Sequence, residues 1–270
     1  MSKISHLSQI HPDVKLGNNV TIDPFVTIYS DVEIGDNTWI GPNVTIMSGT
    51  RIGSNCKIFP GAVLGAEPQD LKFGGEYSTL EIGNYVTIRE YATVKRGTKA
   101  RGKTVIHDHV LLMSYTHVAH DCIIGQHSVL AAFAGLAGHV EIGEYVILGG
   151  YAAVHQFTKI GNHAFVRGGS LVTKDVPPFV KAVRDPIYFS GVNVVGLRRR
   201  QFSLEETQAI QEVYRVIFSN GLNTSQAIEY IEEKMIHLPH AQIIVDFVKS
   251  SSRGIIKGKM LNGHKVETTW

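Results

Sequence analysis

The sequence predicts a mainly β protein, a parallel β-helix of hexapeptide repeats that carries a small α-helical domain at its C-terminal end. The first observation is a period of six. Ile, Leu or Val occupies every sixth position from Ile4 to Val172, and the exceptions are Asp70, Glu76 and Ala100. The second observation is a switch to helical periodicity in the last third of the chain.

The period of six fits neither a helix nor an ordinary strand. A helix requires apolar spacing near 3.6, whereas a strand alternates with period two. Glycine often follows the aliphatic residue, as in Gly17, Gly35 and Gly125. This pattern is typical of short strands joined by turns, where Gly or Asn relieves backbone strain. Three hexads close one triangular coil, so we predict a β-helix over residues 1–190.

Two insertions interrupt the repeat without changing its phase. Residues 65–79 and 97–103 have the composition of loops, and the aliphatic positions resume at Ile82 and Ile106. Long loops on a regular scaffold are common places for function. The repeat is predicted to end near Asp175–Pro178, because proline cannot donate a ladder hydrogen bond and strand pairing should stop there.

Residues 191–270 are predicted to form the helical domain. Ser203-Leu204-Glu205-Glu206 is a capping box that opens a helix ending near Gly221. A second helix is expected after Thr224, and a third through residues 243–248.

Composition predicts a folded, cytoplasmic protein. Of 270 residues, 43% are hydrophobic and 19% are charged, and the formal net charge of +2 gives no reason to expect nucleic acid. Cys56 and Cys122 form no CxxC pair, which argues against a disulfide framework. The N-terminus lacks the apolar core of a signal peptide, and no apolar run is long enough for a membrane span.

One group of histidines is predicted to be structural. His109, His127 and His163 share a position around the coil with Asn19 and Asn37. Histidine and asparagine both tolerate left-handed backbone, so these residues are expected to be turn formers at the surface.

A second group is the candidate for chemistry. His117, His120, His139 and His155 gather on one corner region, and Asp121 lies one coil away from His139. A histidine that is hydrogen-bonded to a carboxylate can accept a hydroxyl proton in the correct tautomer. The alternative is that these are polar residues of a solenoid edge without catalytic function.

A zinc site is a competing hypothesis, since clustered imidazoles can bind Zn²⁺ with a position left open for water. The His117-x-x-His120 spacing is narrower than that of the hexapeptide-repeat carbonic anhydrases, which argues against it. The chain has no GxSxG motif and no P-loop. A histidine base that activates a substrate hydroxyl requires neither, and we expect no metal and no cofactor.

The chain resembles the acyl-[acyl-carrier-protein]–UDP-N-acetylglucosamine O-acyltransferase family of lipid A biosynthesis over nearly its whole length. The resemblance is carried by PQDLKF (68–73), HVAHDC (117–122), LAGHV (136–140), AVHQF (153–157), DVPP (175–178) and GVNVVGLRRRQFS (191–203). It implies left-handed β-helices in a homotrimer, with active sites between subunits. It also implies transfer of an (R)-3-hydroxyacyl group from acyl carrier protein to the 3-hydroxyl of UDP-N-acetylglucosamine.

The resemblance also implies residue roles. His120 matches the general base, Asp121 the carboxylate that orients it, and Gly138 the backbone N–H donor to the oxyanion. Matches to substrate-binding positions are Gln69, Asp70, Lys72, His117, His139, His155, Gln156, Gly168, Asn193, Arg199 and Arg200. Asn193, Arg199 and Arg200 match nucleotide or phosphate contacts.

Gly168 matches the position that lines the far end of the acyl groove, where the lack of a side chain predicts a long hydroxyacyl chain. Lys95 and Val195 depart from the family pattern, in which some members have His and Glu there. Arg198, Arg199, Arg200, Lys257 and Lys259 are candidate contacts for the acidic carrier protein. The other functional hypotheses are a related acyltransferase that uses an acetylated or 3-amino sugar nucleotide, and a non-catalytic scaffold solenoid.

Overall fold

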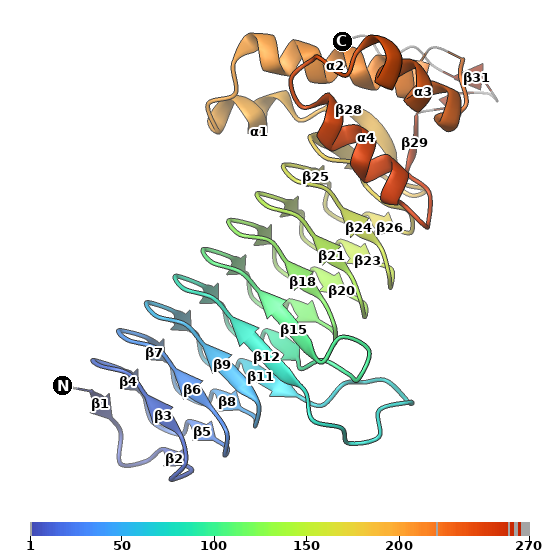
Figure 1. Cartoon of the computed structure of the whole chain (residues 1–270). Coiled ribbons are helices and arrows are strands. Elements are labelled where there is room, and N and C mark those ends of the chain that lie inside the picture. The colour runs from blue at the N-terminus through green and yellow to red at the C-terminus, as the bar shows by residue number, and fades with distance from the viewer. Residues whose placement is uncertain (1, 220, 259, 262–263, 266–270) are drawn as a thin grey trace.

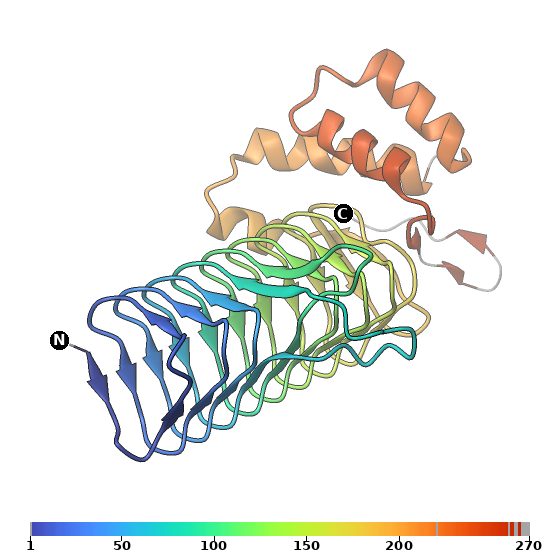
Figure 2. The same cartoon turned by 60° about the horizontal axis from the view of Figure 1, so that its bottom comes forward.

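The computed structural model describes residues 2–219, 221–258, 260–261 and 264–265. It shows a prism of stacked coils with helices at the C-terminal end (Figure 1). Three strands make one coil, and every third strand joins the same parallel sheet, so three sheets form the walls. The triangular outline of the coils is visible in Figure 2. Among the described residues, no helix is both long and apolar enough to cross a membrane.

The strands of the walls are short, and most contain two residues. The first wall contains β1 (Lys3–Ile4), β4 (Thr21–Ile22), β7 (Trp39–Ile40), β10 (Lys57–Ile58), β13 (Thr87–Ile88), β16 (Leu111–Leu112), β19 (Val129–Leu130), β22 (Ile147–Leu148) and β25 (Phe165–Val166). The second contains β2 (Gln9–Ile10), β5 (Thr27–Ile28), β8 (Thr45–Ile46), β11 (Val63–Ala66), β14 (Thr93–Lys95), β17 (His117–Val118), β20 (Gly135–Leu136), β23 (Ala153–Val154) and β26 (Leu171–Val172). The third contains β3 (Lys15–Leu16), β6 (Glu33–Ile34), β9 (Thr50–Ile52), β12 (Thr79–Ile82), β15 (Lys103–Ile106), β18 (Ile123–Ile124), β21 (Glu141–Ile142) and β24 (Lys159–Ile160).

The aliphatic residue of each hexad forms the core, as the sequence predicts. Ile40, Ile58, Ile88 and Leu112 stack above one another in the first wall and are fully buried. Neighbouring residues of a strand point to opposite faces, so each two-residue strand places one side chain inside and one outside. Each buried CH₂ contributes roughly 0.8 kcal/mol. Among the described residues β1 is the edge strand of its sheet, and Ile4 is therefore half exposed.

The two insertions leave the coils in register. Paired residues in the first wall are normally 18 apart, as in Thr21↔Trp39. They are 30 apart across the first insertion (Lys57↔Thr87) and 24 apart across the second (Thr87↔Leu111). The insertions therefore add twelve and six residues, which together equal one coil. The segments between strands are 67–78 and 96–102. The flanking strands include residues 65, 66, 79 and 103, which we predicted as loop, and the second segment begins one residue earlier than predicted.

Strand pairing continues past the prolines, so the prediction that it stops at Asp175–Pro178 was wrong. The first wall extends into β27 (Val180–Val183), which pairs in parallel with β25. A hairpin then joins β27 to β28 (Tyr188–Val192), and β28 pairs with β29 (Lys257–Gly258). Pro178 lies in a turn, where no ladder N–H is needed, while the Val176 N–H still donates to the Lys159 carbonyl at 2.9 Å.

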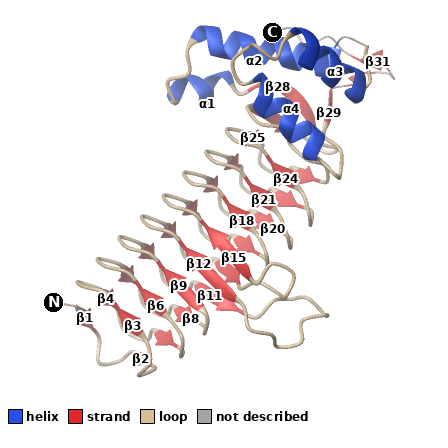
Figure 3. Ribbon diagram, viewed as in Figure 1, coloured by secondary structure: helices blue, strands red, loops and turns tan. Residues whose placement is uncertain are grey.

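The helices follow the β-helix, with a short β30 (Met260–Leu261) and β31 (His264–Lys265) pair after them (Figure 3). They are α1 (Val194–Arg199), α2 (Leu204–Ser219), α3 (Thr224–Lys234) and α4 (Ala241–Ser250). The predicted capping box of α2 is confirmed by reciprocal Ser203–Glu206 hydrogen bonds of 2.8 and 3.0 Å. The sequence pattern missed α1, because six residues are too few to show helical periodicity.

The helical domain is attached to the last coil by buried polar contacts. The hydroxyl of Tyr214, a fully buried residue of α2, donates to the Pro178 carbonyl at 2.6 Å. Just beyond α4, the Ser251 hydroxyl donates to the buried Asp175 carboxylate, also at 2.6 Å. The helices cover the end of the prism that lies opposite β1 (Figure 1).

Candidate active site

One corner of the prism carries a ladder of stacked rings. His109, His127 and His163 have left-handed φ values of 58–60°, and Asn19 and Asn37 at the same corner have 56° and 57°. The prediction that these histidines are turn formers is confirmed, but only His109 is exposed, while His127 and His163 are half-buried. Their rings stack with those of two tyrosines: neighbouring centroids along Tyr85, His109, His127, Tyr145 and His163 are 4.6–5.1 Å apart. Ring stacking and the left-handed turn conformation together explain why histidine occupies these positions.

A second corner places a carboxylate where the first has a ring. Asp121 and His139 have φ values of 60° and 63° and lie one coil apart. The His139 N–H donates to the His120 carbonyl at 3.0 Å, which brings the two coils into contact here. The sequence segment His120-Asp121 thus lies directly beneath His139.

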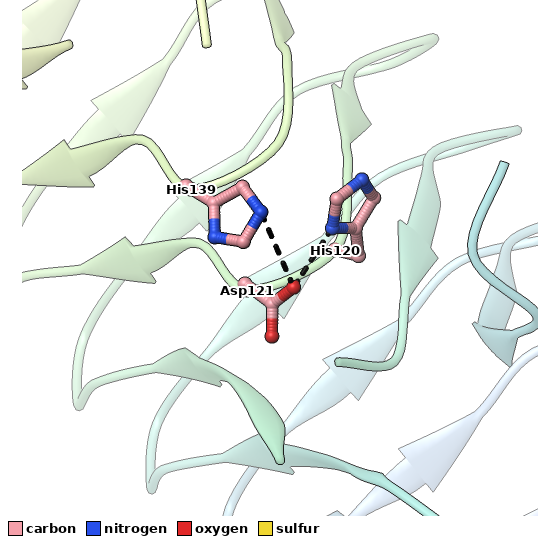
Figure 4. A group of neighbouring side chains, drawn as sticks. All are labelled: His120, Asp121 and His139. Atoms are coloured by element: carbon pink, nitrogen blue, oxygen red, sulfur yellow. Dashed lines mark hydrogen bonds and ion pairs between the residues drawn. The ribbon is translucent and has the colours of Figure 1, made fainter. Parts of the chain in front are cut away.

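These three side chains converge on one oxygen atom (Figure 4). His120 Nδ1 lies 2.8 Å from Asp121 Oδ2, and His139 Nε2 lies 3.7 Å from the same oxygen. The second ring nitrogen of His120 faces away from Asp121. His120 retains 12% side-chain exposure, whereas Asp121 has none. The pair therefore has the geometry of a base that is oriented by a buried carboxylate.

Thr98 holds the buried carboxylate in place. Its N–H donates to Asp121 Oδ1 at 3.0 Å, and its hydroxyl donates to Oδ2 at 2.7 Å. Burial raises the pKa of Asp121, but the hydrogen bonds from Thr98 and His120 outweigh that effect and keep the pKa below its usual value. Asp121 is therefore ionised at neutral pH. Sequence reasoning missed Thr98, which lies in the second insertion, outside the repeat.

The two insertions and this corner enclose a pocket of about 630 Å³. It brings together six of the residues singled out from the sequence, namely Gln69, Asp70, Lys72, His120, His139 and Gln156. It is also lined by residues that sequence reasoning missed, namely Leu71, Phe73, Glu76, Thr98, Lys99, Ala100 and Phe157. Most of these lie in the insertions, whose paths the hexad period does not specify.

Gly138 lies against His120. A Cβ at Gly138 would lie 2.6 Å from His120 Cε1 and 2.7 Å from Nε2, so only glycine leaves the ring in its place. The Gly138 N–H has no hydrogen-bond partner within the described part of the chain. A free N–H beside the ring can donate to an oxyanion that forms there.

Two of the predicted histidines lie outside the pocket lining. His117 points outward from β17 and lies 2.8 Å from the Thr93 hydroxyl. Burial lowers the pKa of His117, and the charge of Lys95, one of the two departures from the family pattern, lowers it further. His155 is exposed, and its Nδ1 lies 3.1 Å from the Gln156 carbonyl oxygen.

Gly168 lies in an exposed turn at a corner of the prism, just after β25. A Cβ there would lie 2.8 Å from the Gly150 carbonyl oxygen, and a Cβ on Gly149 would lie 2.2 Å from the Gly168 nitrogen. Close stacking of these coils by itself requires glycine. Substitution at Gly168 would therefore strain this turn as well as fill any groove beside it.

The residues that match nucleotide contacts lie at the junction with the helical domain. Asn193 caps α1 and donates to the His163 carbonyl at 2.9 Å. Arg199 is exposed at the end of α1. Arg200 donates to the Tyr145 carbonyl at 2.9 Å, and its Nη1 is buried without a hydrogen-bond partner among the described residues. None of the three lines the pocket around His120.

A metal could be held only by His120, Asp121 and His139, whose ligand atoms lie within 4.8 Å of one another among the described residues. This set contains two of the four clustered histidines, His120 and His139, and includes neither His117 nor His155. Both Asp121 oxygens already accept hydrogen bonds, and a metal ion would have to displace them.

The fold and this corner define a class of protein. A family model described as bacterial transferase hexapeptide (six repeats) matches residues 31–66 and 103–138. A second model, described as domain 2 of UDP N-acetylglucosamine O-acyltransferase, matches residues 175–256. The chain is thus a hexapeptide-repeat transferase, and its β-helix is left-handed, as we predicted.

Similarity to known proteins extends over almost the whole chain. The acyl-[acyl-carrier-protein]–UDP-N-acetylglucosamine O-acyltransferase of Chlorobium phaeobacteroides is 58% identical over 255 residues, which cover 94% of this chain and 97% of that protein. Its counterpart in Sulfurihydrogenibium sp. is 57% identical and covers 92% and 94%. The crystal structure of a UDP-N-acetylglucosamine acyltransferase from Bacteroides fragilis matches with a TM-score of 0.92 at 46% identity, covering 94% and 100%.

The chain belongs to the family of acyl-[acyl-carrier-protein]–UDP-N-acetylglucosamine O-acyltransferases. The predicted family resemblance and the predicted fold class are confirmed.

Proposed function

We propose that this enzyme carries out the first step of lipid A biosynthesis by moving an (R)-3-hydroxyacyl chain from acyl carrier protein to the 3-hydroxyl of UDP-N-acetylglucosamine. Family membership defines the acyltransferase activity and its two substrates. The observation that supports the chemistry is the His120–Asp121 pair, 2.8 Å apart at the edge of a pocket of about 630 Å³.

In the proposed mechanism His120 is the general base. Its Nε2 accepts the proton of the sugar hydroxyl as the hydroxyl oxygen attacks the thioester carbonyl carbon. Asp121 accepts the Nδ1–H, which holds the reactive tautomer and stabilises the imidazolium that forms. The Gly138 N–H donates to the carbonyl oxygen as it becomes an oxyanion. When the tetrahedral intermediate collapses, the C–S bond breaks and the leaving thiolate takes the proton from His120.

The remaining predicted residues are proposed substrate contacts. Gln69, Asp70, Lys72, His139 and Gln156 share the pocket with His120 and support binding of the sugar and the thioester. Because His117 and His155 lie just outside that lining, we propose that they contact the acyl chain or the sugar along its path to the pocket. We keep Gly168 as the proposed end of the acyl groove. Competition between hydroxyacyl donors of about ten and fourteen carbons tests it on the wild type, with the longer donor expected to win.

A homotrimer is part of the proposal, because the nucleotide-contact candidates Asn193, Arg199 and Arg200 lie apart from the His120 pocket within one chain. An aligned row of partly exposed apolar side chains supports subunit packing. It runs along the outer face of the first wall at Leu111, Val129, Ile147 and Phe165.

Light scattering should report a trimer. Co-assembly of His120→Ala and Arg199→Ala chains should restore activity if sites are shared, and restore none if each site lies within one chain.

We place the reaction in the cytoplasm, where the carrier protein and the sugar nucleotide are available. The direct test of function is thiol release from a hydroxyacyl carrier protein. Release should depend on UDP-N-acetylglucosamine and should not occur with the 3-amino analogue alone. Release that requires the amino sugar would favour an N-acyltransferase, and no release with either sugar would favour the non-catalytic scaffold.

A further inference from the structure

The two insertions are locked together by the carboxylate of Glu76. Its Oε1 accepts the Lys99 N–H of the second insertion at 3.0 Å, and its Oε2 accepts the Gly74 N–H of the first insertion at 2.8 Å. Backbone N–H groups that point at a carboxylate favour its charged form, and they lower the pKa of Glu76. Glu76 therefore joins the segment that lines the pocket with Gln69, Asp70 and Lys72 to the segment that contains Thr98.

Thr98 is held in one orientation by two hydrogen bonds besides those to Asp121, and by a third at its neighbour Lys99. Its hydroxyl donates to Asp121 and also accepts the Ala100 N–H at 3.2 Å. Its carbonyl accepts the Gly102 N–H at 2.7 Å. The N–H of its neighbour Lys99 donates to the Glu76 carboxylate. Thr98 is only 5% exposed, so water cannot readily replace its hydroxyl on Asp121.

From this continuous set of contacts we infer that Thr98 and Glu76 are positioning residues for the acyl transfer. Thr98 orients the Asp121 carboxylate, which in turn orients His120. Glu76 fixes the insertion that presents Thr98 and ties it to the insertion that lines the substrate pocket. This inference rests on the proposed role of the His120–Asp121 pair, but the two are separable by experiment.

The contact geometry predicts different effects for the two residues. Without the Thr98 hydroxyl, Asp121 Oδ2 loses a donor at 2.7 Å, and the carboxylate is free to turn toward His139, which now lies 3.7 Å away. His120 then loses its alignment, so kcat falls while binding of the sugar nucleotide is retained. Without the Glu76 carboxylate the second insertion loses its hydrogen bond at the Lys99 N–H, and the link between the two insertions is weakened. We therefore expect a lower kcat and a higher KM.

Steady-state kinetics with UDP-N-acetylglucosamine and a hydroxyacyl carrier protein test the inference. Thr98→Val keeps the shape of the side chain but removes the hydroxyl, and we expect kcat to fall roughly 10- to 100-fold with KM for the sugar nucleotide within about twofold. Thr98→Ser restores the hydroxyl and should recover kcat to within about threefold of the wild type. A structural role alone would not produce this split between kcat and KM together with rescue by serine.

Glu76→Ala should lower kcat about tenfold and raise KM for the sugar nucleotide several-fold. Glu67→Ala is the matched control: Glu67 is a carboxylate of the same insertion, but its side chain is 72% exposed, and its ion pair with Arg96 Nη2 at the start of the second insertion is long, at 3.4 Å, and involves neither Thr98 nor Lys99. It should leave kcat and KM near wild type. If Thr98→Val fails to fold, the comparison of kcat and KM between Glu76→Ala and Glu67→Ala tests the inference.

The inference is overturned if Thr98→Val keeps kcat within twofold of the wild type, if Thr98→Ser is as impaired as Thr98→Val, or if Glu76→Ala behaves like Glu67→Ala. His120→Ala in the same assay separates the two levels. An inactive His120→Ala beside a normal Thr98→Val refutes the positioning role alone. An active His120→Ala refutes the proposed base itself.

Discussion

Two corners of the β-helix share one backbone conformation but differ in environment. His109 and His127 have φ values of 60° and 58°, and Asp121 and His139 have 60° and 63°. At the first corner the imidazoles stack between tyrosine rings. At the second, Asp121 takes the place of a ring and lies fully buried beneath the second insertion. The turn geometry selects residues that tolerate positive φ, whereas the insertion over the turn creates the site.

Among the predicted effects, that of Asp121→Asn on kcat should be the largest, because this substitution removes the carboxylate that distinguishes the second corner. The amide cannot stabilise an imidazolium and can favour the wrong tautomer of His120, so kcat should fall roughly 10³- to 10⁴-fold. Thermal unfolding should change far less than activity, and calorimetry checks this. A variant with kcat within tenfold of the wild type would show that the carboxylate does not orient the base.

Gly138→Ala should have the next largest effect. The added methyl would lie 2.6 Å from His120 Cε1, and the ring would have to move because it is the flexible partner. We expect kcat to fall about 10- to 100-fold while the fold is retained. Gly135→Ala is the matched control on the neighbouring strand, since a Cβ there meets nothing within 4 Å. Equal activity of the two alanine variants would contradict the proposed contact.

His163 of the first corner should make the free energy of unfolding depend on pH in the acid range. Burial, Arg200 and His240 lower the pKa of His163 to about 4, from an ordinary value of 6.5. Between pH 6.5 and pH 4 the His163 imidazole is therefore protonated in the unfolded chain but mostly neutral in the folded chain. The free energy of unfolding falls as pH drops through this range. Allowing for partial exposure, we expect a loss of about 1 kcal/mol between pH 7 and pH 5.

Denaturant titrations of the wild type and His163→Phe at both pH values measure this loss. Phenylalanine can stack on Tyr145 and Phe179 but does not titrate, so the variant should lose less stability than the wild type. Carboxylates such as Glu206, which pairs with His240 at 3.0 Å, contribute to both proteins and cancel in the comparison. If the wild type and His163→Phe lost the same stability between pH 7 and pH 5, His163 would not be the source of the loss.

Charge reversal in the helical domain should have the smallest effect. Arg198 is exposed in α1, and Lys3 is exposed at the opposite end of the prism. Arg198→Glu should raise KM for the acidic acyl carrier protein several-fold, more at low salt than at high salt, and leave KM for the sugar nucleotide unchanged. Lys3→Glu should alter neither constant. Equal donor KM values for both variants would exclude Arg198 from docking. Lys259, the other basic candidate near the C-terminus, lies outside the described residues.

The repeat explains why most of the fold could be predicted from the sequence. Each hexad buries one aliphatic side chain, so the period itself specifies the walls and the turn positions such as Asn19 and His109. The β27–β28 hairpin and α1 were missed because they leave that period and depend on packing against the last coil. Counting by coils placed Asp121 beside His139, but the path of the insertions is not periodic, so Thr98 and Glu76 could not be found that way.

The central claim is that chemistry belongs to the second corner and not to the first. The most direct test is kcat/KM for carrier-protein thiol release in His120→Ala beside His109→Asn, since asparagine already occupies the latter turn position elsewhere in the β-helix. The account predicts a loss of about 10³-fold for His120→Ala and activity within about twofold of wild type for His109→Asn. Activity of His120→Ala above a tenth of wild type, or an equal loss in His109→Asn, would contradict it.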